Sequence, residues 1–263
     1  MNYGLLSLVA AAVAVAPAAV KAPRHAAPQG DQWSWHGRIA AGKTLEIRGV
    51  NGRVEAEPGT GAEVVVTATK RAHQHGDAEV VKIEVVEHDG GVTICAVYPG
   101  SRNRCGPDDD YHMSTHDNDV EVAFHAQIPA GVAFAGATVN GDVEAMGLAA
   151  RVDVTTVNGS ARLETTGGDA AAHTVNGSVT AVLHGSGTGP LRFDTVNGSV
   201  TLSVPKDLSA DFEAETVNGS IDTDFPITVT GRINRQHLEG RIGQGGRRLH
   251  AETVNGSIRL RAL

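Results

Sequence analysis

The chain has 263 residues, 41% of them hydrophobic, which is enough for one large all-β domain with a buried core. Its formal net charge is −8, whereas a nucleic-acid-binding protein needs a concentrated basic face, so we expect no nucleic-acid partner. Aromatic residues make up only 4% of a chain that contains 32 glycines. This composition disfavours an aromatic-lined small-molecule pocket, and we expect no cofactor.

The N-terminal region has the pattern of a secretory signal peptide. Residues 4–16 are an unbroken run of small or apolar residues, followed by small-residue cleavage sites. No Lys or Arg precedes the run, which is atypical. The run is shorter than the roughly 20 residues that a membrane span needs, and Pro17 interrupts it. We predict a signal peptide at 1–22, a flexible leader at 23–32 and a mature chain without a membrane span. The protein is then exported to the periplasm, the cell surface or the medium.

The predicted domain, 33–263, begins with the only two tryptophans, Trp33 and Trp35, which we expect to cap its end. Alternating strands then flank a first Asn-Gly corner at Asn51. His73 and His75 would share one face of a strand, but no third metal ligand accompanies them, and we expect both at the surface.

An insertion at about 71–119 is predicted to contain a β-hairpin and both cysteines. Strands at 80–86 and 92–98 flank Asp89-Gly90-Gly91, a pattern typical of a hairpin turn. In an exported protein, Cys95 and Cys105 are predicted to form a disulfide that closes a short loop. Two unpaired thiols are the alternative.

The acidic segment 108–119 offers the best metal ligands in the sequence, with Asp108, Asp110, His112 and His116 as weak candidates. It lacks the glycine and the closing glutamate of an EF-hand. We therefore expect a solvated acidic loop and predict no metal site.

A repeat dominates the rest of the chain. Val-Asn-Gly occurs seven times, and from Val157 onward it is extended to Thr-Val-Asn-Gly-Ser. Spacings of 18–21 residues in the main array predict an all-β, parallel β-helix-like solenoid with one corner in each coil. The flanking residues alternate with period two and slip by one at the motif, where Asn and Gly tolerate left-handed backbone angles.

Stacked coils place equivalent residues about 4.8 Å apart, so the corner residues are predicted to form structural ladders. Because the corner gives each Asn a structural role, we interpret its match to the glycosylation pattern as a by-product. The position before each Thr is expected to face water, at Thr155, His173, Asp194, Glu215 and Glu252. The predicted ladders comprise Asn140, Asn158, Asn176, Asn197, Asn218 and Asn255, their neighbours Gly141, Gly159, Gly177, Gly198, Gly219 and Gly256, and Thr138, Thr156, Thr174, Thr195, Thr216 and Thr253.

The glycine-rich run 240–246 has no Gly-Lys-Ser/Thr and no following helix, so it is not a phosphate-binding loop. We interpret it as the turn of a hairpin that caps the end of the solenoid.

Carboxylates on an outer face are the remaining candidates for catalysis, because solenoid enzymes that cleave polysaccharides use such groups. Charged residues are expected on an outer face in any case. We predict no catalytic residues and no enzyme activity. The candidates weighed are Asp153, Asp194, Glu215 and Asp222.

Three stretches together resemble the bacterial putative-adhesin family, a group of exported domains of unknown function. They are Gly42–Ile47 leading to Asn51–Val54, then 128–132, and the closing Gly240–Gly243 with Thr253–Ile258. The resemblance covers about 35–263 and implies a β-solenoid without established catalytic residues. It does not account for the cysteine-containing insertion or the acidic run.

These observations predict an exported, non-enzymatic, adhesin-like module that binds an unknown envelope polymer or protein, or is structural there. A rigid stack offers an extended surface rather than a pocket. Two alternatives stay open: a periplasmic accessory domain that senses the envelope through a protein partner, and a carbohydrate-active β-helix enzyme.

Overall fold

The computed structural model describes residues 31–263 except 75, 108–110, 116–117 and 186. The predicted signal peptide and nearly all of the leader lie outside this range. The described part is entirely β-structure and loops, as predicted. It contains no helix able to cross a membrane.

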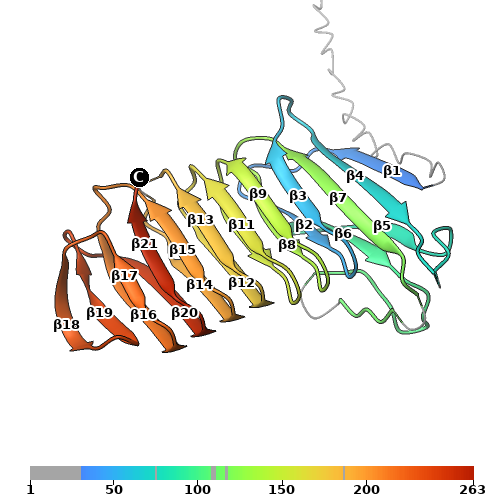
Figure 1. Ribbon diagram of the computed structural model, residues 1–263. Coiled ribbons are helices and arrows are strands. Elements are labelled where there is room, and N and C mark those ends of the chain that lie inside the picture. The colour runs from blue at the N-terminus through green and yellow to red at the C-terminus, as the bar shows by residue number, and fades with distance from the viewer. Residues whose placement is uncertain (1–30, 75, 108–110, 116–117, 186) are drawn as a thin grey trace, which may run out of the picture.

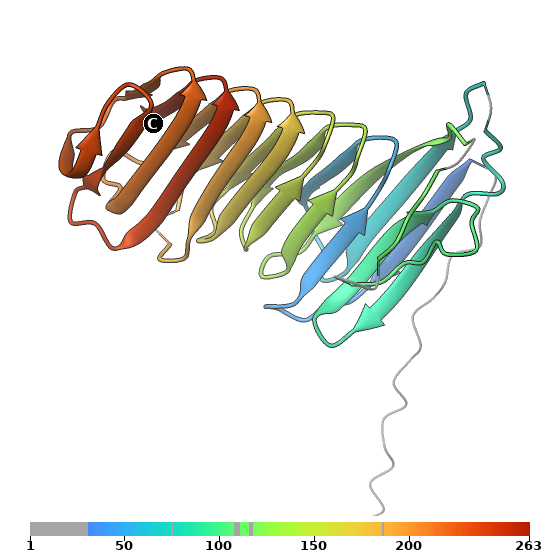
Figure 2. The ribbon, with the colours of Figure 1, turned by 90° about the horizontal axis from the view of Figure 1, so that it is seen from below.

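The strands form two sheets that face each other along an elongated molecule (Figures 1 and 2). Sheet A contains, in spatial order, β1 (Gln32–Gly37), β4 (Val64–Arg71), β7 (Glu121–Ile128), β3 (Val54–Pro58), β9 (Val143–Leu148), β11 (Ala161–Thr165), β13 (Val179–Leu183), β15 (Val200–Val204), β21 (Ile258–Ala262) and β17 (Ile221–Thr223). Sheet B contains β18 (Ile227–Ile233), β19 (His237–Ile242), β16 (Ala210–Asn218), β20 (Arg247–Asn255), β14 (Leu191–Asn197), β12 (Ala170–Asn176), β10 (Val152–Thr155), β8 (Ala133–Ala137), β2 (Thr44–Arg48), β6 (Gly91–Val97) and β5 (Lys82–His88).

Each coil runs along one strand of sheet B, turns a corner and returns along one strand of sheet A. Neighbouring coils pair in parallel in both sheets, so the predicted β-solenoid is confirmed. In spatial order the coils are β6–β7, β2–β3, β8–β9, β10–β11, β12–β13, β14–β15, β20–β21 and β16–β17. The segment predicted as an insertion therefore also supplies one strand of a coil, since β6 is both an arm of the β5–β6 hairpin and the parallel partner of β2.

The spatial order of the coils differs from their order in the chain. The last coil in sequence, β20–β21, lies between β14–β15 and β16–β17 (Figure 1). The asparagine ladder therefore does not follow chain order: Asn255 lies between Asn197 and Asn218. The reason is that β18 and β19 occupy the outer side of β16 as antiparallel strands, and the chain then crosses back to the inner side.

The core lies between the two sheets and is filled by the inward residues of every strand. Phe193 and Phe212 in sheet B and Leu202 in sheet A are at most 1% exposed. Each fully buried aliphatic or aromatic side chain of this kind contributes roughly 1.5–3 kcal/mol. The period-two pattern of the sequence thus assigns one face of each strand to this core.

Antiparallel strands cover both ends of the stack. At the N-terminal end, β1 and β4 extend sheet A and β5 extends sheet B. Trp35 on β1 is only 2% exposed, and Trp33 packs beside the core. At the C-terminal end, the hairpin is formed by β18 and β19.

The glycine-rich run near the C-terminus is not the turn of that hairpin, and this interpretation was wrong. Residues 243–246 connect β19 to β20, which lie on opposite sides of β16. The crossing needs left-handed backbone angles, with φ of 57°, 74° and 104° at Gly243, Gly245 and Gly246. Gly246 N donates to Asp211 Oδ2 at 3.1 Å, which fastens the crossing to β16.

The corner asparagines form a continuous exposed chain of side-chain hydrogen bonds. From the second coil of this chain onward, each Nδ2 donates to the Oδ1 of the asparagine in the coil before it, toward the N-terminal end of the stack, at 2.7–2.9 Å. Amide ladders of this kind satisfy polar groups repeatedly along a stack. In order, the chain comprises Asn51, Asn140, Asn158, Asn176, Asn197, Asn255 and Asn218.

The corner threonines point inward and bond to the glycine of the neighbouring coil. Thr195 is 4% exposed, and its Oγ1 donates to the carbonyl oxygen of Gly177 at 2.8 Å. The same bond recurs at 2.7–2.9 Å along the stack. A hydroxyl in this place satisfies a carbonyl that the turning backbone leaves without a ladder partner.

Most corner positions require glycine because neighbouring coils approach each other closely there, and not because the backbone adopts a positive φ. Among the corner glycines that the structure describes, positive φ occurs only at Gly52 and Gly141. At Gly159, Gly177 and Gly198, a Cβ would instead overlap the carbonyl group of the preceding coil's glycine. The expectation of left-handed angles thus holds for the first corners only, and the repeated corners need glycine for space.

Replacing Gly198 by Val tests this close approach. The backbone carbonyl of Gly177 cannot move aside without opening the ladder, so we expect a loss of about 1–3 kcal/mol of unfolding free energy. Gly61→Ala is the control, because its Cβ meets only Glu63 N at 3.9 Å. Urea denaturation should leave the control within about 0.5 kcal/mol of the parent. Equal stability of both variants would contradict the corner geometry.

Thr195→Val tests the hydroxyl-to-carbonyl bond. The valine keeps the shape but leaves the Gly177 carbonyl without its donor, which should cost about 1–3 kcal/mol. Thr201→Val on β15, where the side chain faces outward, provides a matched control in the same coil. Thermal unfolding should separate the two variants, and a Tm of Thr195→Val equal to that of the control would refute the role of the hydroxyl.

Candidate functional site

The outer face of sheet B carries two in-register rows of ionisable side chains toward the C-terminal end. One row aligns His173, Asp194, Glu252, Glu215 and His237 across β12, β14, β20, β16 and β19. The second row, two residues earlier, contains Arg192, His250, Glu213 and Glu239. The residue before each corner Thr therefore lies on this face.

Asp194 on β14 is the best-partnered carboxylate of the face. Its Oδ2 accepts a hydrogen bond from Arg192 Nε at 2.7 Å and lies 2.9 Å from His173 Nδ1. Burial raises the pKa of Asp194, but the bonds from His173 and Arg192 outweigh it, and the pKa lies below its ordinary value. Asp194 is therefore ionised at neutral pH.

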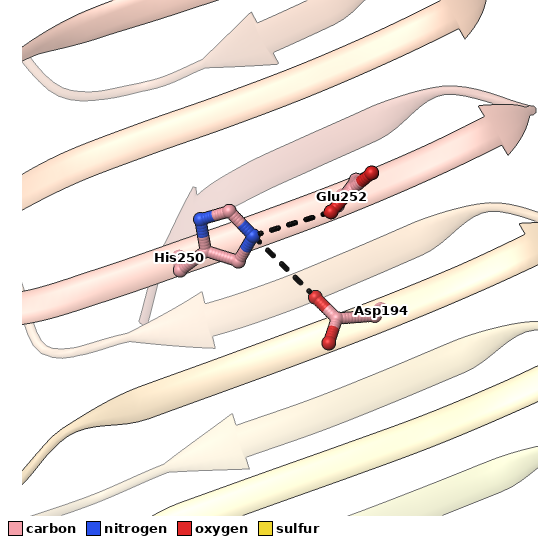
Figure 3. Close-up of side chains that lie close together, drawn as sticks. All are labelled: Asp194, His250 and Glu252. Carbon is pink, nitrogen blue, oxygen red and sulfur yellow. Dashed lines mark ion pairs between the residues drawn. The ribbon is translucent and has the colours of Figure 1, made fainter.

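His250 lies between two carboxylates (Figure 3). Its Nε2 is 3.6 Å from Asp194 Oδ1 and 3.5 Å from Glu252 Oε2. One ligand atom from each of the three residues lies within 4.8 Å of the others. Asp194 Oδ1 and His250 Nε2 are both buried and have no hydrogen-bond partner.

The contacts continue outward on β16 and β19. His250 Nδ1 is 3.4 Å from Glu213 Oε2, and His237 Nδ1 is 2.7 Å from Glu215 Oε1. His250 and His237 thus each contact a carboxylate on the neighbouring strand β16.

The structure does not bring the four carboxylates weighed for catalysis together. Asp153 is on β10 in the middle of sheet B and lies 3.6 Å from Arg151. Asp222 is on sheet A, where it pairs with Arg261 at 2.6 Å. Asp194 and Glu215 share a row but are separated by β20. Asp194 and Glu252 do approach each other, and His250 Nε2 lies 3.6 and 3.5 Å from their carboxylate oxygens.

Of the weak metal candidates in the acidic loop, only His112 lies within the described residues. It is exposed and pairs through its backbone with Arg104. Asp108, Asp110 and His116 lie outside the described residues, as does His75. His73 lies 3.3 Å from Glu121 Oε2 at the surface.

The predicted disulfide is present and joins Cys95 on β6 to Cys105, with a Cα–Cα distance of 5.7 Å. Nearby, the Tyr98 hydroxyl donates to the Val120 carbonyl at 2.6 Å, and burial raises the pKa of Tyr98 to about 12. Arg48 lies over the Tyr111 ring, 4.9 Å from its centroid. These contacts hold the loop after β6 against the end of the stack.

A cavity lies at the N-terminal end of the stack, away from the charged rows of sheet B. Its volume is about 510 Å³, and it lies beside β1 and β5 and is lined by Trp33, Trp35, Lys70, Val81 and Ile83 among others. The Lys70 Nζ in this cavity donates hydrogen bonds to the Ala78 and Val81 carbonyls at 2.8 and 3.1 Å, so these bonds already use the ammonium group.

The sequence did not single out His250, nor its neighbours in the rows, Arg192, Glu213, His237 and Glu239. The outward position of His250, two residues before Glu252, follows from the alternation in β20. Its contact with Asp194 depends on β20 lying beside β14. Chain order would instead place β16 beside β14.

A family model matches residues 42–261, most of the chain, and is described as Toastrack DUF4097. The chain belongs to this family. Toastrack DUF4097 is a domain family of unknown function, so membership identifies the fold and leaves the role of the face open.

Two solved structures are similar over most of their length. A putative cell adhesion protein from Clostridium sporogenes ATCC 15579 is 14% identical, with a TM-score of 0.48 and coverage of 88% of this chain and 100% of that chain. A putative adhesin from Bacteroides fragilis NCTC 9343 is 12% identical, with a TM-score of 0.31 and coverage of 89% and 98%. Neither likeness bears on what this chain binds. Among curated proteins, no relative is found.

Asp194→Ala tests whether the partnered carboxylate stabilises the face. Removing the acceptor leaves Arg192 and His173 without their shared partner, and we expect a loss of about 1 kcal/mol at pH 7. Asp222→Ala is the control. Asp222 pairs with Arg261 at 2.6 Å, but its side chain is 59% exposed, so this ion pair should contribute at most about 0.5 kcal/mol. Urea denaturation measures both, and a larger loss in the control would contradict the assignment.

Proposed function

We propose that this Toastrack domain is an exported, non-enzymatic module that binds or supports envelope polymers or proteins in an adhesin-like way. The observation that carries the proposal is the uninterrupted stack of parallel coils, closed by antiparallel strands at both ends. Such a stack is rigid along its length and presents an extended face. An extended face suits a long or repetitive ligand better than a small substrate.

The charged rows of sheet B are the favoured contact surface. Their side chains come from successive coils in register, so charges repeat along the stack at about the strand spacing of 4.8 Å. A polymer with repeating charges or hydroxyl groups could contact several coils at once, and several weak contacts would add to a useful affinity.

The absence of catalysis is inferred from how the carboxylates are engaged. Asp194, Glu215 and Asp222 each have a histidine or arginine partner within 2.9 Å. A general acid or base must reach its substrate, and at least one oxygen of each of these carboxylates is occupied by a neighbour.

Export is supported by two features of the chain. Residues 1–22 have the signal-peptide pattern, and the Cys95–Cys105 disulfide is of the kind that persists in oxidising compartments.

The test incubates the purified mature chain, about 23–263, with insoluble envelope polysaccharides and measures both retained protein and newly released sugar ends. We expect retention without release. Arg241 and Arg248 stand opposite Asp211 on the same outer face, next to the row of His250, Glu213 and Glu239. Arg241→Ala/Arg248→Ala should reduce retention, whereas Arg162→Ala/Arg259→Ala on sheet A, the same chemical change on the opposite face, should not.

Release of sugar ends would overturn the non-enzymatic assignment and favour the carbohydrate-active alternative. Failure to be retained by any polymer would contradict polymer binding and favour a protein partner, as in an envelope-sensing accessory domain. Equal loss in both double variants would contradict the choice of face.

A further inference from the structure

We propose that Asp194, His250 and Glu252 form a binding site for a divalent transition-metal ion, for which Zn²⁺ is the probe. The ligand atoms are Asp194 Oδ1, His250 Nε2 and Glu252 Oε2, from β14 and β20 on the outer face of sheet B (Figure 3). The inference stands apart from the proposed function, since an adhesin-like surface requires no metal.

Two of the three separations between ligand atoms match those of a zinc site, and the third is at most 4.8 Å. Zn²⁺ binds nitrogen and carboxylate oxygen at roughly 2.0–2.2 Å in tetrahedral geometry, which places two ligand atoms about 3.4 Å apart. His250 Nε2 lies 3.5 Å from Glu252 Oε2 and 3.6 Å from Asp194 Oδ1. Both distances are too long for a hydrogen bond and suit two ligands of one ion.

Two of the three ligand atoms face each other as an ion pair at 3.6 Å, a distance at which neither forms a hydrogen bond. Asp194 Oδ1 and His250 Nε2 are buried among their neighbours without a hydrogen-bond partner. Buried polar atoms are normally satisfied, and an exception calls for an explanation, such as a bound ion. Figure 3 shows His250 Nε2 facing the carboxylates of both Asp194 and Glu252.

The surrounding contacts have the form of a second ligand shell. A metal-binding histidine usually donates its other ring nitrogen to a carboxylate, and His250 Nδ1 faces Glu213 Oε2 at 3.4 Å. A metal-binding carboxylate is usually fixed by hydrogen bonds through its second oxygen. Asp194 Oδ2 has this support from Arg192 and His173, which leaves Oδ1 for the ion.

The arrangement of negative charges also favours a bound cation. Asp194, Glu252 and Glu215 stand side by side on three neighbouring strands, and like charges opposite one another destabilise a sheet. A divalent cation between Asp194 and Glu252 would offset part of this repulsion. Glu215 instead contacts His237 Nδ1 at 2.7 Å.

One imidazole and two carboxylates favour Zn²⁺ and related first-row ions over Ca²⁺, which takes six to eight oxygen ligands. Three protein ligands leave a fourth position. Because the Glu252 side chain is 47% exposed, that position opens toward solvent, where water or a group of a bound partner could complete it.

The test is calorimetric titration of the folded mature chain with Zn²⁺ after removal of metals with a chelator. We expect one tight site per chain. Replacing a ligand should weaken this site about tenfold or more, as even loss of a supporting residue typically costs 10- to 100-fold. The variants are His250→Gln and Glu252→Gln, both at the surface, with circular dichroism to verify the fold.

His237→Gln is the matched control. His237 also lies between two carboxylates, with Glu215 at 2.7 Å and Glu239 at 3.9 Å, but its ring nitrogens already face these groups separately. The control should keep the parent affinity within about twofold. The visible absorption of bound Co²⁺ gives a second readout and should be lost in His250→Gln but not in His237→Gln.

Equal Zn²⁺ affinity in parent and His250→Gln would show adventitious binding by other histidines and overturn the proposal. Absence of any tight site in the parent would also overturn it, and His250 would then be an ion-pair partner of Asp194 only. Because zinc binding is measured without a polymer, these outcomes are independent of the retention assay.

Discussion

The whole molecule depends on how closely one coil can approach the next at the Thr-Val-Asn-Gly-Ser corner. A sheet demands a strand spacing of about 4.8 Å, and a turning backbone can keep that spacing only if no side chain stands in the way. Gly177 and Gly198 provide the space, since a Cβ on either would overlap the preceding carbonyl. The inward threonine and the outward asparagine of the same motif then bond across the same gap.

This contact determines more than the corner. Once the corners are stacked, the residues before them are in register, so side chains of every coil align into rows on the outer face. Asn197 and Asn255 are 58 residues apart in the chain, yet their side chains bond at 2.7 Å. Asp194 and Glu252 are brought together by the same register. A face assembled in this way can hold a metal ion or an extended partner without a pocket.

The sequence predicted the fold well because the repeat reports a local rule that every coil obeys. Alternation identified the buried face of β14 and β15, and the even pair of cysteines identified the disulfide. The order of the coils is a different matter. The position of β20 between β14 and β16 results from the β18–β19 hairpin occupying the far edge of β16, which no repeat spacing encodes. His250 was missed for this reason, since its neighbour Asp194 is known only once β20 is placed. The glycine run was misinterpreted for the same reason, because it bridges two strands that are not adjacent.

The most direct test of this account is a crystal structure of the chain with Zn²⁺, with anomalous scattering measured on both sides of the zinc absorption edge. The account predicts one strong peak on the outer face of sheet B, bounded by Asp194, His250 and Glu252, with β20 paired to β14. A peak elsewhere, or none, would contradict the metal site. A stack in which β16 rather than β20 pairs with β14 would contradict the coil order on which the site depends.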